Sequence, residues 1–186
     1  MGYAIAESLA EKGAQVVIIS GPVTITTCHP NIKIIHVVSA REMYDESVRI
    51  FPECDVAILS AAVSDYTPVV HFNQKLKRKE EKLHMELKPT VDIAAALGRM
   101  KRKDQVLIGF ALESENEIWN ATKKIKNKNL DFIVLNSLRD KGAGFRTDTN
   151  KVTIIDRDNN IQEFKLKQKK EVAEDIVSKL MNYFDN

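Results

Sequence analysis

The stretch Gln15-Val16-Val17-Ile18-Ile19-Ser20-Gly21-Pro22 decides the fold class of this chain. Its four consecutive β-branched residues, closed by a Ser-Gly-Pro turn, are typical of a strand that is covered on both faces in a parallel sheet. Similar runs recur, and they predict strands over residues 33–38, 55–59, 106–110 and 132–135 and helices over residues 40–50 and 115–128. This alternation predicts an α/β fold, Rossmann-like and doubly wound around a mostly parallel sheet.

Two parts of the chain depart from this alternation, namely residues 64–87, which hold no clear helix, and the residues beyond Asn136. Residues 151–155 and 161–166 predict a β-hairpin, and residues 172–184 predict an amphipathic helix. No linker divides the chain, so we expect a single nucleotide-binding domain over residues 1–186. The chain opens with a helical pattern, whereas a doubly wound fold begins with a strand and a glycine-rich phosphate-binding turn. We therefore expect a domain truncated at its N-terminus, in keeping with its content of only seven glycines.

Composition and charge exclude several classes of function. The 28 basic and 26 acidic residues leave a net charge of +2, too small a bias to predict a nucleic-acid-binding protein. No apolar run approaches the roughly 20 residues that a membrane span needs, and the first residues do not form a signal peptide. Cys28 and Cys54 have neither a metal-binding spacing nor a disulfide framework, which is typical of reduced thiols in a cytoplasmic protein.

Residues 60–66, Ser-Ala-Ala-Val-Ser-Asp-Tyr, follow a predicted strand at its carboxyl end, the edge where open α/β sheets bind ligands. The small side chains of Ala61 and Ala62 let a ligand approach the backbone there. Asp65 can hold a cation or a sugar hydroxyl, or it can cap a turn. The residue types and their position leave both roles of Asp65 open.

Two groups of lysines suit a polyphosphate. Residues 75–82, Lys-Leu-Lys-Arg-Lys-Glu-Glu-Lys, place flexible cations on a predicted loop, where they either neutralise phosphate charge or form a solvated surface. Lys124 and Lys128 lie four residues apart and project to one side of a predicted helix, whose dipole they also complement. Thr90 is the expected N-cap of a further helix, whose first backbone N–H groups can meet a base or a phosphate.

Eight short motifs extend over nearly the whole chain. They are Met-Gly-Tyr-Ala-Ile-Ala at 1–6, Ser-Gly-Pro-Val at 20–23, Ala-Ala-Val-Ser-Asp-Tyr at 61–66, Lys-Leu-Lys-Arg at 75–78, Lys-Pro-Thr-Val-Asp-Ile at 88–93, Gly-Phe-Ala-Leu-Glu at 109–113, Lys-Asn-Leu-Asp at 128–131 and Gly-Phe-Arg-Thr-Asp-Thr-Asn at 144–150. In this order and spacing they resemble the phosphopantothenate–cysteine ligase family of coenzyme A biosynthesis. In bacteria, members of this family are often fused behind phosphopantothenoylcysteine decarboxylase.

The resemblance implies a two-step reaction. A nucleoside triphosphate, CTP in most bacteria rather than ATP, activates the carboxylate of 4′-phosphopantothenate as an acyl-nucleotide and releases pyrophosphate. The amino group of cysteine then displaces the nucleoside monophosphate. By motif, Asp65 binds the nucleotide through Mg²⁺, and Lys75 is the catalytic lysine at its phosphates. The other implied nucleotide contacts are Val91, Asp92, Ile93, Ala94, Phe110, Lys124 and Lys128, and the implied substrate contacts are Ala61 and Ala62.

The resemblance also implies a homodimer, in which residues 83–87 are the strand expected to pair across a two-fold axis.

The sequence departs from the family's pattern at two places. Family members usually carry an Ile-Ser-Asn-x-Ser-Ser-Gly-Lys stretch, with a catalytic asparagine and a glycine loop for phosphopantothenate, immediately before the motif that Met1-Gly2 opens here. Val91 stands where proline is common before Asp92. We therefore expect the 186 residues alone to retain nucleotide contacts but to have little or no ligase activity.

Two other functions are open at this point. A short-chain-type NAD(P)-dependent oxidoreductase fits the Rossmann-like strand, but that strand ends in Ser20-Gly21 rather than in an acidic residue for the ribose. In addition, no tyrosine is followed four residues later by lysine. A non-enzymatic nucleotide-binding module is the second alternative, because the glycine-rich loop is not among these residues.

Overall fold

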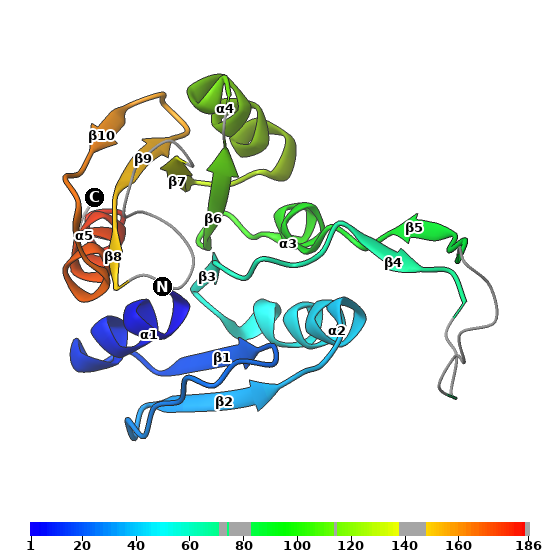
Figure 1. Cartoon of the computed structure of the whole chain (residues 1–186). Coiled ribbons are helices and arrows are strands. Elements are labelled where there is room, and N and C mark those ends of the chain that lie inside the picture. Colours follow the sequence, from blue (N-terminus) through cyan, green and yellow to red (C-terminus); the bar gives the residue numbers. More distant parts are fainter. Residues whose placement is uncertain (71–73, 75–82, 114, 138–147, 185–186) are drawn as a thin grey trace.

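The computed structural model describes residues 1–70, 74, 83–113, 115–137 and 148–184, and its centre is a five-stranded sheet (Figure 1). The strand order is β10-β9-β7-β6-β3. Strands β3, β6 and β7 pair in parallel, whereas the β7–β9 and β9–β10 pairs are antiparallel. The bounds are β3 Val56–Leu59, β6 Val106–Glu113, β7 Phe132–Ser137, β9 Val152–Asp156 and β10 Ile161–Glu163. The predicted α/β fold with a mostly parallel sheet and a C-terminal hairpin is confirmed.

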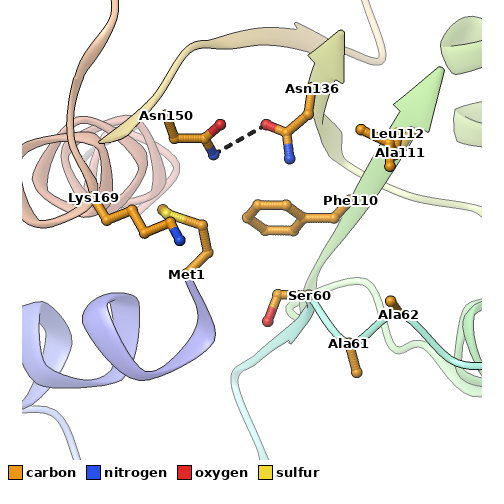
Figure 2. A pocket seen from close by; sticks show the side chains of 10 residues that line it. All are labelled: Met1, Ser60, Ala61, Ala62, Phe110, Ala111, Leu112, Asn136, Asn150 and Lys169. Carbon is orange, nitrogen blue, oxygen red and sulfur yellow. Dashed lines mark hydrogen bonds between the residues drawn. The ribbon is translucent and has the colours of Figure 1, made fainter. Parts of the chain in front are cut away.

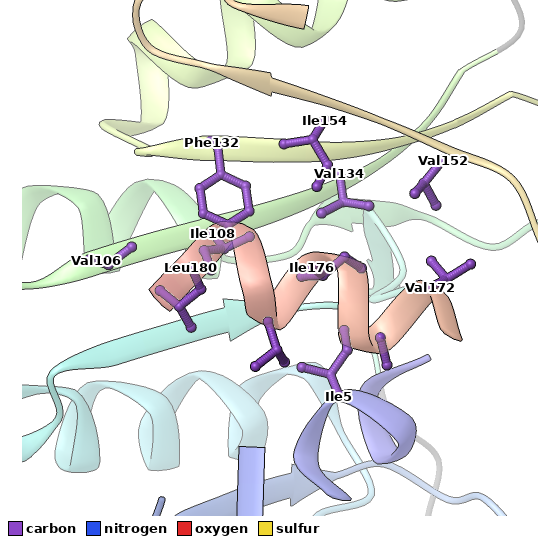
Figure 3. Packing of buried hydrophobic residues seen from close by; sticks show 12 residues of the cluster. Ile5, Val106, Ile108, Phe132, Val134, Val152, Ile154, Val172, Ile176 and Leu180 are labelled. Carbon is purple, nitrogen blue, oxygen red and sulfur yellow. The ribbon is translucent and has the colours of Figure 1, made fainter. Parts of the chain in front are cut away.

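Side chains alternate between two cores, one on each face of this sheet. Val106 and Ile108 of β6 pack with α1 (Gly2–Glu11) and α5 (Lys169–Met181), as Figure 3 shows. Leu107 and Ala111 face the opposite core with α3 (Ile93–Met100) and α4 (Glu117–Lys128). Because both faces are covered, the strands are apolar at successive positions, which is why they were visible in the sequence.

The β-branched run Val16-Val17-Ile18-Ile19 forms a strand in a separate sheet. Strand β1 (Val16–Ser20) pairs in parallel with β2 (Ile32–His36), and the helix α2 (Ala40–Ile50) follows. Among the described strands, neither β1 nor β2 is hydrogen-bonded to β3, so the single sheet expected from the alternation is divided. Side-chain periodicity identifies strands but does not report which strand is the neighbour of which.

A two-stranded antiparallel ribbon extends away from the body of the molecule (Figure 1). It consists of β4 (Tyr66–Pro68) and β5 (Leu87–Pro89), so the strand expected over residues 83–87 begins only at Leu87. A second short ribbon pairs β8 (Thr149–Asn150) with β11 (Lys167–Gln168) and leads into α5. The short 3-10 helix η1 (Phe51–Glu53) completes the described elements.

Helix α5 begins earlier than its apolar periodicity predicts. Gln168 and Glu171 form a capping box, in which the Glu171 carboxylate accepts from the Gln168 backbone N–H at 3.0 Å, and this fixes the start at Lys169. The helix ends at Met181, so Phe184, the last residue of the expected helix, lies beyond it and is half exposed. Within the described residues, none of the helices has both the length and the apolarity to span a bilayer.

Candidate functional site

A cavity of about 220 Å³ opens where β3, β6 and β7 end at their carboxyl edges (Figure 2). Its lining residues come from the start of α1, the segment after β3, the two central strands, β8 and the start of α5: Met1, Ser60, Ala61, Ala62, Phe110, Ala111, Leu112, Asn136, Asn150 and Lys169. This is the edge at which open α/β sheets bind ligands.

Three predicted contact residues line this cavity. Ala61 and Ala62 are exposed at its rim, and the ring of Phe110 forms part of its wall. The start of α1 comes close as well, since a Cβ added to Gly2 would lie 2.7 Å from Ser60 Oγ. A ligand in the cavity would therefore contact the predicted small residues and the N-terminal turn of α1 together.

A second group of predicted residues gathers next to this cavity, around the start of α3. Thr90 holds it together, because its hydroxyl donates to the Ser64 carbonyl at 2.6 Å and its backbone N–H donates to the Asp65 carbonyl at 2.9 Å. The exposed Asp65 is thereby placed beside Val91 and Asp92. Two motifs that lie far apart in the sequence thus meet at one loop.

Asp92, and not Thr90, is the N-cap of α3. Its carboxylate accepts from the Ala95 backbone N–H at 3.0 Å, whereas the Thr90 hydroxyl is used in the tether to Ser64. Burial raises the pKa of Asp92, but the Ala95 N–H and the Lys128 ammonium at 2.9 Å outweigh it, so the pKa lies below its usual value. Asp92 therefore stays ionised next to the exposed Val91.

The side chains of α3 and α4 in this group differ in their access to a ligand. Ile93 is buried in the core, so only its backbone can reach a ligand, while Ala94 is half buried. On α4, Lys128 pairs with Asp92 and Lys124 pairs with Glu113 at 2.6 Å. Each of the two lysines expected to hold a polyphosphate thus already has a carboxylate partner, and a phosphate would have to compete with it.

The predicted catalytic Lys75 lies outside the described residues. The predicted Mg²⁺ contact, Asp65, is exposed, and the described residues form no cluster of three or more His, Cys, Asp or Glu side chains around it or elsewhere. A lone carboxylate fits Mg²⁺ that is bound mainly by nucleotide phosphates and water, because Mg²⁺ sites often use only one or two carboxylates. It does not fit a metal held by the protein alone.

Three polar residues of the cavity were not identified from the sequence: Asn136, Asn150 and Lys169. Asn136 comes near the carboxyl end of β7, so the strand-edge argument that selected residues 60–66 applies equally to it. Asn150 and Lys169 meet the cavity only through the pairing of β8 with β11, which the sequence does not reveal.

The chain matches the family described as "DNA/pantothenate metabolism flavoprotein C-terminal domain" over residues 1–183. It belongs to this family. The family that the sequence motifs resemble is thereby confirmed, and an oxidoreductase of the short-chain type is not favoured.

Curated and solved members of the family resemble the chain closely. A protein named cysteine/cysteine sulfinic acid decarboxylase, from an unknown prokaryotic organism, is 53% identical over 97% of this chain and 50% of its own length. The coenzyme A biosynthesis bifunctional protein CoaBC of Bacillus subtilis (strain 168) is 40% identical over 97% of this chain and 44% of its own length. The crystal structure of a CoaBC C-terminal domain has a TM-score of 0.80 at 37% identity, covering all of this chain and 83% of that one. The chain thus spans about half the length of the curated relatives.

Proposed function

We propose that the chain is the nucleotide-binding ligase domain of a coenzyme A biosynthesis protein, joining 4′-phosphopantothenate to cysteine at the expense of CTP, in preference to ATP. The observation that carries the proposal is the Thr90 tether, which gathers the predicted nucleotide residues next to the cavity lined by Ala61 and Ala62. Membership of the family and the name of the CoaBC relatives support the reaction class.

In the first step, the carboxylate of 4′-phosphopantothenate attacks the α-phosphorus of CTP and pyrophosphate leaves. The described residues are arranged to place these two anions together. Ala61 and Ala62 leave room for the acyl chain, and Phe110, in the same cavity, contacts the nucleotide. Lys124 and Lys128 exchange their carboxylate partners for phosphate oxygens, and Lys75 neutralises the charge that develops on the phosphates.

In the second step, the amine of cysteine attacks the acyl carbon and CMP leaves. The protein's task is to hold the acyl-nucleotide so that water does not reach it before cysteine does. Val91, Asp92, Ile93 and Ala94 contact base and ribose at the start of α3, in part through backbone groups. Asp65 would hold Mg²⁺ brought in with the nucleotide, and that ion would supply charge neutralisation of the phosphates.

The division of the sheet supports the view that the described residues are one part of a larger domain. With one strand placed between β1 and β3, the order β2-β1-x-β3-β6-β7 would match the doubly wound order 3-2-1-4-5-6. The start of α1 beside Ser60 fits a helix that follows such a strand. We propose that the 186 residues alone bind nucleotide but have little or no ligase activity.

The reaction is tested by pyrophosphate release from 4′-phosphopantothenate, cysteine and either CTP or ATP. A longer protein that contains these residues should turn over with CTP preferred, while the 186-residue chain should not turn over but should bind CTP in calorimetry. Turnover of the short chain at ordinary enzyme rates would overturn the truncation proposal. Failure of the longer protein to release pyrophosphate with either nucleotide would overturn the ligase proposal.

Lys75→Ala in the longer protein separates a ligase from a nucleotide-binding module that does no chemistry. In a ligase, this variant loses turnover more than nucleotide affinity, because the lysine acts on charge that develops in the transition state. The exposed Lys103, which lies in the turn before β6, provides the control variant Lys103→Ala, with turnover unchanged. A fall in affinity alone would favour the binding module.

One relative is named as a decarboxylase, and the chain matches only half of that protein, so the decarboxylase activity has to be assigned to one of its two halves. We propose that decarboxylation belongs to a second domain, fused to or associated with this one, because the chain matches only half of that relative and a similar share of the bifunctional proteins. Carbon dioxide release from cysteine, cysteine sulfinic acid or phosphopantothenoylcysteine by the 186-residue chain alone would contradict this division of labour.

The ribbon of β4 and β5 supports a homodimer. Apolar side chains are exposed on the ribbon and next to it (Tyr66, Val69, Val70, Leu83, Met85 and Leu87), and a two-stranded ribbon is only marginally stable alone. We expect a solution mass of twice 21.0 kDa by light scattering. Val70→Asp should give monomers, whereas Val23→Asp, at another exposed valine, should leave the dimer intact. A monomeric wild-type chain, or a Val70→Asp dimer, would contradict the proposal.

A further inference from the structure

The two asparagines of the cavity are oriented by a backbone group. The N–H of Lys151 can only donate, and it lies 3.1 Å from the Asn150 side-chain oxygen, which fixes that oxygen as the acceptor. The Asn150 side-chain nitrogen therefore faces Asn136 and donates to its side-chain oxygen at 3.2 Å. The Asn136 side-chain nitrogen is left as a donor, and Figure 2 shows it pointing into the cavity.

Lys169 brings a positive charge to the same cavity. Its backbone N–H donates to the Asp148 carbonyl, so the side chain is anchored at the first residue of α5. Among the described residues, no carboxylate forms an ion pair with the Lys169 ammonium, although its neighbours Lys167 and Lys170 pair with Asp175 and Glu11.

The described lining of the cavity offers no negative charge to balance this lysine. None of the ten described lining residues is acidic, and the described wall near Lys169 is formed by Met1, Phe110 and the two asparagines. An ammonium with no described counter-ion that lines the same partly apolar cavity as a fixed amide donor makes this cavity a favourable place for an anion. Described lysines elsewhere near the site, such as Lys124 and Lys128, already have carboxylate partners.

We propose that Lys169 and Asn136 bind the phosphate monoester of 4′-phosphopantothenate and thereby position this substrate in the cavity. This inference rests on the proposed ligase function and adds to it the residues that select a phosphorylated substrate. The Lys169 ammonium supplies the charge, and the Asn136 amide supplies a directed hydrogen bond.

The position of the pair favours the phosphate over the carboxylate of the same substrate. The carboxylate has to meet the nucleotide, and the proposed nucleotide residues Asp65 and Asp92 continue from the Ala61-Ala62 side of the cavity. Lys169 lies across the cavity from Ala61 and Ala62 (Figure 2). An acyl chain that extends from Ala61 to Lys169 keeps its two negative ends apart.

Calorimetric titration of a longer protein that contains these residues, with 4′-phosphopantothenate, pantothenate and CTP as ligands, tests the proposal. Lys169→Ala should weaken binding of 4′-phosphopantothenate about ten- to hundredfold, as expected for a lost charge-assisted hydrogen bond, and leave pantothenate and CTP unaffected. Lys169→Arg should restore most of the affinity because the charge is kept. Lys170→Ala, at an exposed neighbouring lysine, should bind like the wild type.

Asn136→Asp provides an independent second variant. The new carboxylate can still accept from Asn150, but it presents an oxygen instead of an N–H to the cavity, so 4′-phosphopantothenate should bind more weakly than pantothenate. The inference is wrong if Lys169→Ala binds 4′-phosphopantothenate as the wild type does, weakens both acyl ligands equally, or weakens CTP instead. It is also wrong if the wild-type longer protein binds 4′-phosphopantothenate no better than pantothenate.

Measurements on the longer protein distinguish the ligase proposal from the phosphate-site proposal. If its phosphate-dependent binding responds to Lys169→Ala but no pyrophosphate is released with cysteine and a nucleotide, the ligase proposal fails and the phosphate site stands. If pyrophosphate is released and Lys169→Ala leaves the KM for 4′-phosphopantothenate unchanged, the ligase proposal stands and the phosphate site fails.

Discussion

The Lys128 ammonium lies 2.9 Å from the carboxylate of Asp92, the residue that caps α3. This ion pair joins the end of α4 to the start of α3 and holds a cation at the helix terminus proposed to meet the nucleotide. Both side chains are partly exposed, so solvent screens the pair and its contribution to stability is small. We therefore expect the role of Lys128 to be visible in binding more than in folding.

Lys128→Ala should weaken CTP binding about tenfold, the usual size of one lost charge-assisted contact, with little change in melting temperature. Lys126→Ala is the matched control, because it removes an exposed lysine from the same last turn of α4. Calorimetry with CTP on both variants checks the prediction. Equal losses of affinity in the two variants would show that only the overall charge of the helix matters.

Gly98 of α3 lies against the backbone at the end of α4. A Cβ added there would lie 1.9 Å from the Lys128 carbonyl oxygen, a backbone atom that cannot move without displacing the end of α4. Gly98→Ala should therefore destabilise the chain by about 3 kcal/mol and displace the Lys128–Asp92 pair. Gly21→Ala is the control, since its Cβ would meet only the Met43 side chain at 3.9 Å. Chemical unfolding of both variants gives the two free energies.

The sequence predicts a structural element correctly where a single local pattern determines that element. The apolar runs of β6 and β7 are continuous because both faces of the sheet are covered, so strand type and approximate position followed directly from them. The sequence does not decide between two residues that both satisfy the same local pattern. Thr90 and Asp92 are both good N-caps, and the choice between them depends on the Ser64 carbonyl, which takes the Thr90 hydroxyl.

Contacts between distant segments were not predictable either. The ribbon of β4 and β5 pairs segments on either side of the charged stretch 75–82, and among the described strands β1 pairs only with β2 instead of joining the central sheet. The lining of the cavity was also not fully predictable from the sequence. Asn136 could have been selected by its strand end, but Asn150 and Lys169 reach it only through the pairing of β8 and β11. The motif resemblance supplied contact residues without this three-dimensional arrangement.

Asp131 is a buried carboxylate that is held by three donors. It accepts from the Leu107 backbone N–H at 2.7 Å, from Lys101 at 2.8 Å and from Arg157 at 2.7 Å, and the side chains of Asp131 and Lys101 are more than nine-tenths buried. Lys101→Met should destabilise the chain by about 3 kcal/mol, because it leaves part of a buried negative charge without its partner.

The control for Lys101 is an ion pair at the surface. Arg49→Ala removes a partner of Glu46 on an exposed face of α2, where the expected loss is about 0.5 kcal/mol. The double variant Lys101→Met with Asp131→Asn should recover part of the loss, since no buried charge remains. Chemical unfolding that shows equal losses for Lys101→Met and Arg49→Ala would contradict this account of the Asp131 site.

Tyr183 should make the stability of the protein depend on pH in the alkaline range. Burial first, and then the negative charges of Asp156 and Asp131, raise the pKa of Tyr183 to about 12. The folded state thus favours the neutral phenol, so its contribution is complete below about pH 10, the pKa of unfolded tyrosine, and is lost as the pH rises through about 12. Tyr183→Phe should therefore lose less unfolding free energy than the wild type between these two values. In an absorbance titration of tyrosinate, the wild type should show a late phase that Tyr183→Phe lacks and that Tyr66→Phe, at an exposed ring, retains. A late phase that persists in Tyr183→Phe would assign the high pKa to another group.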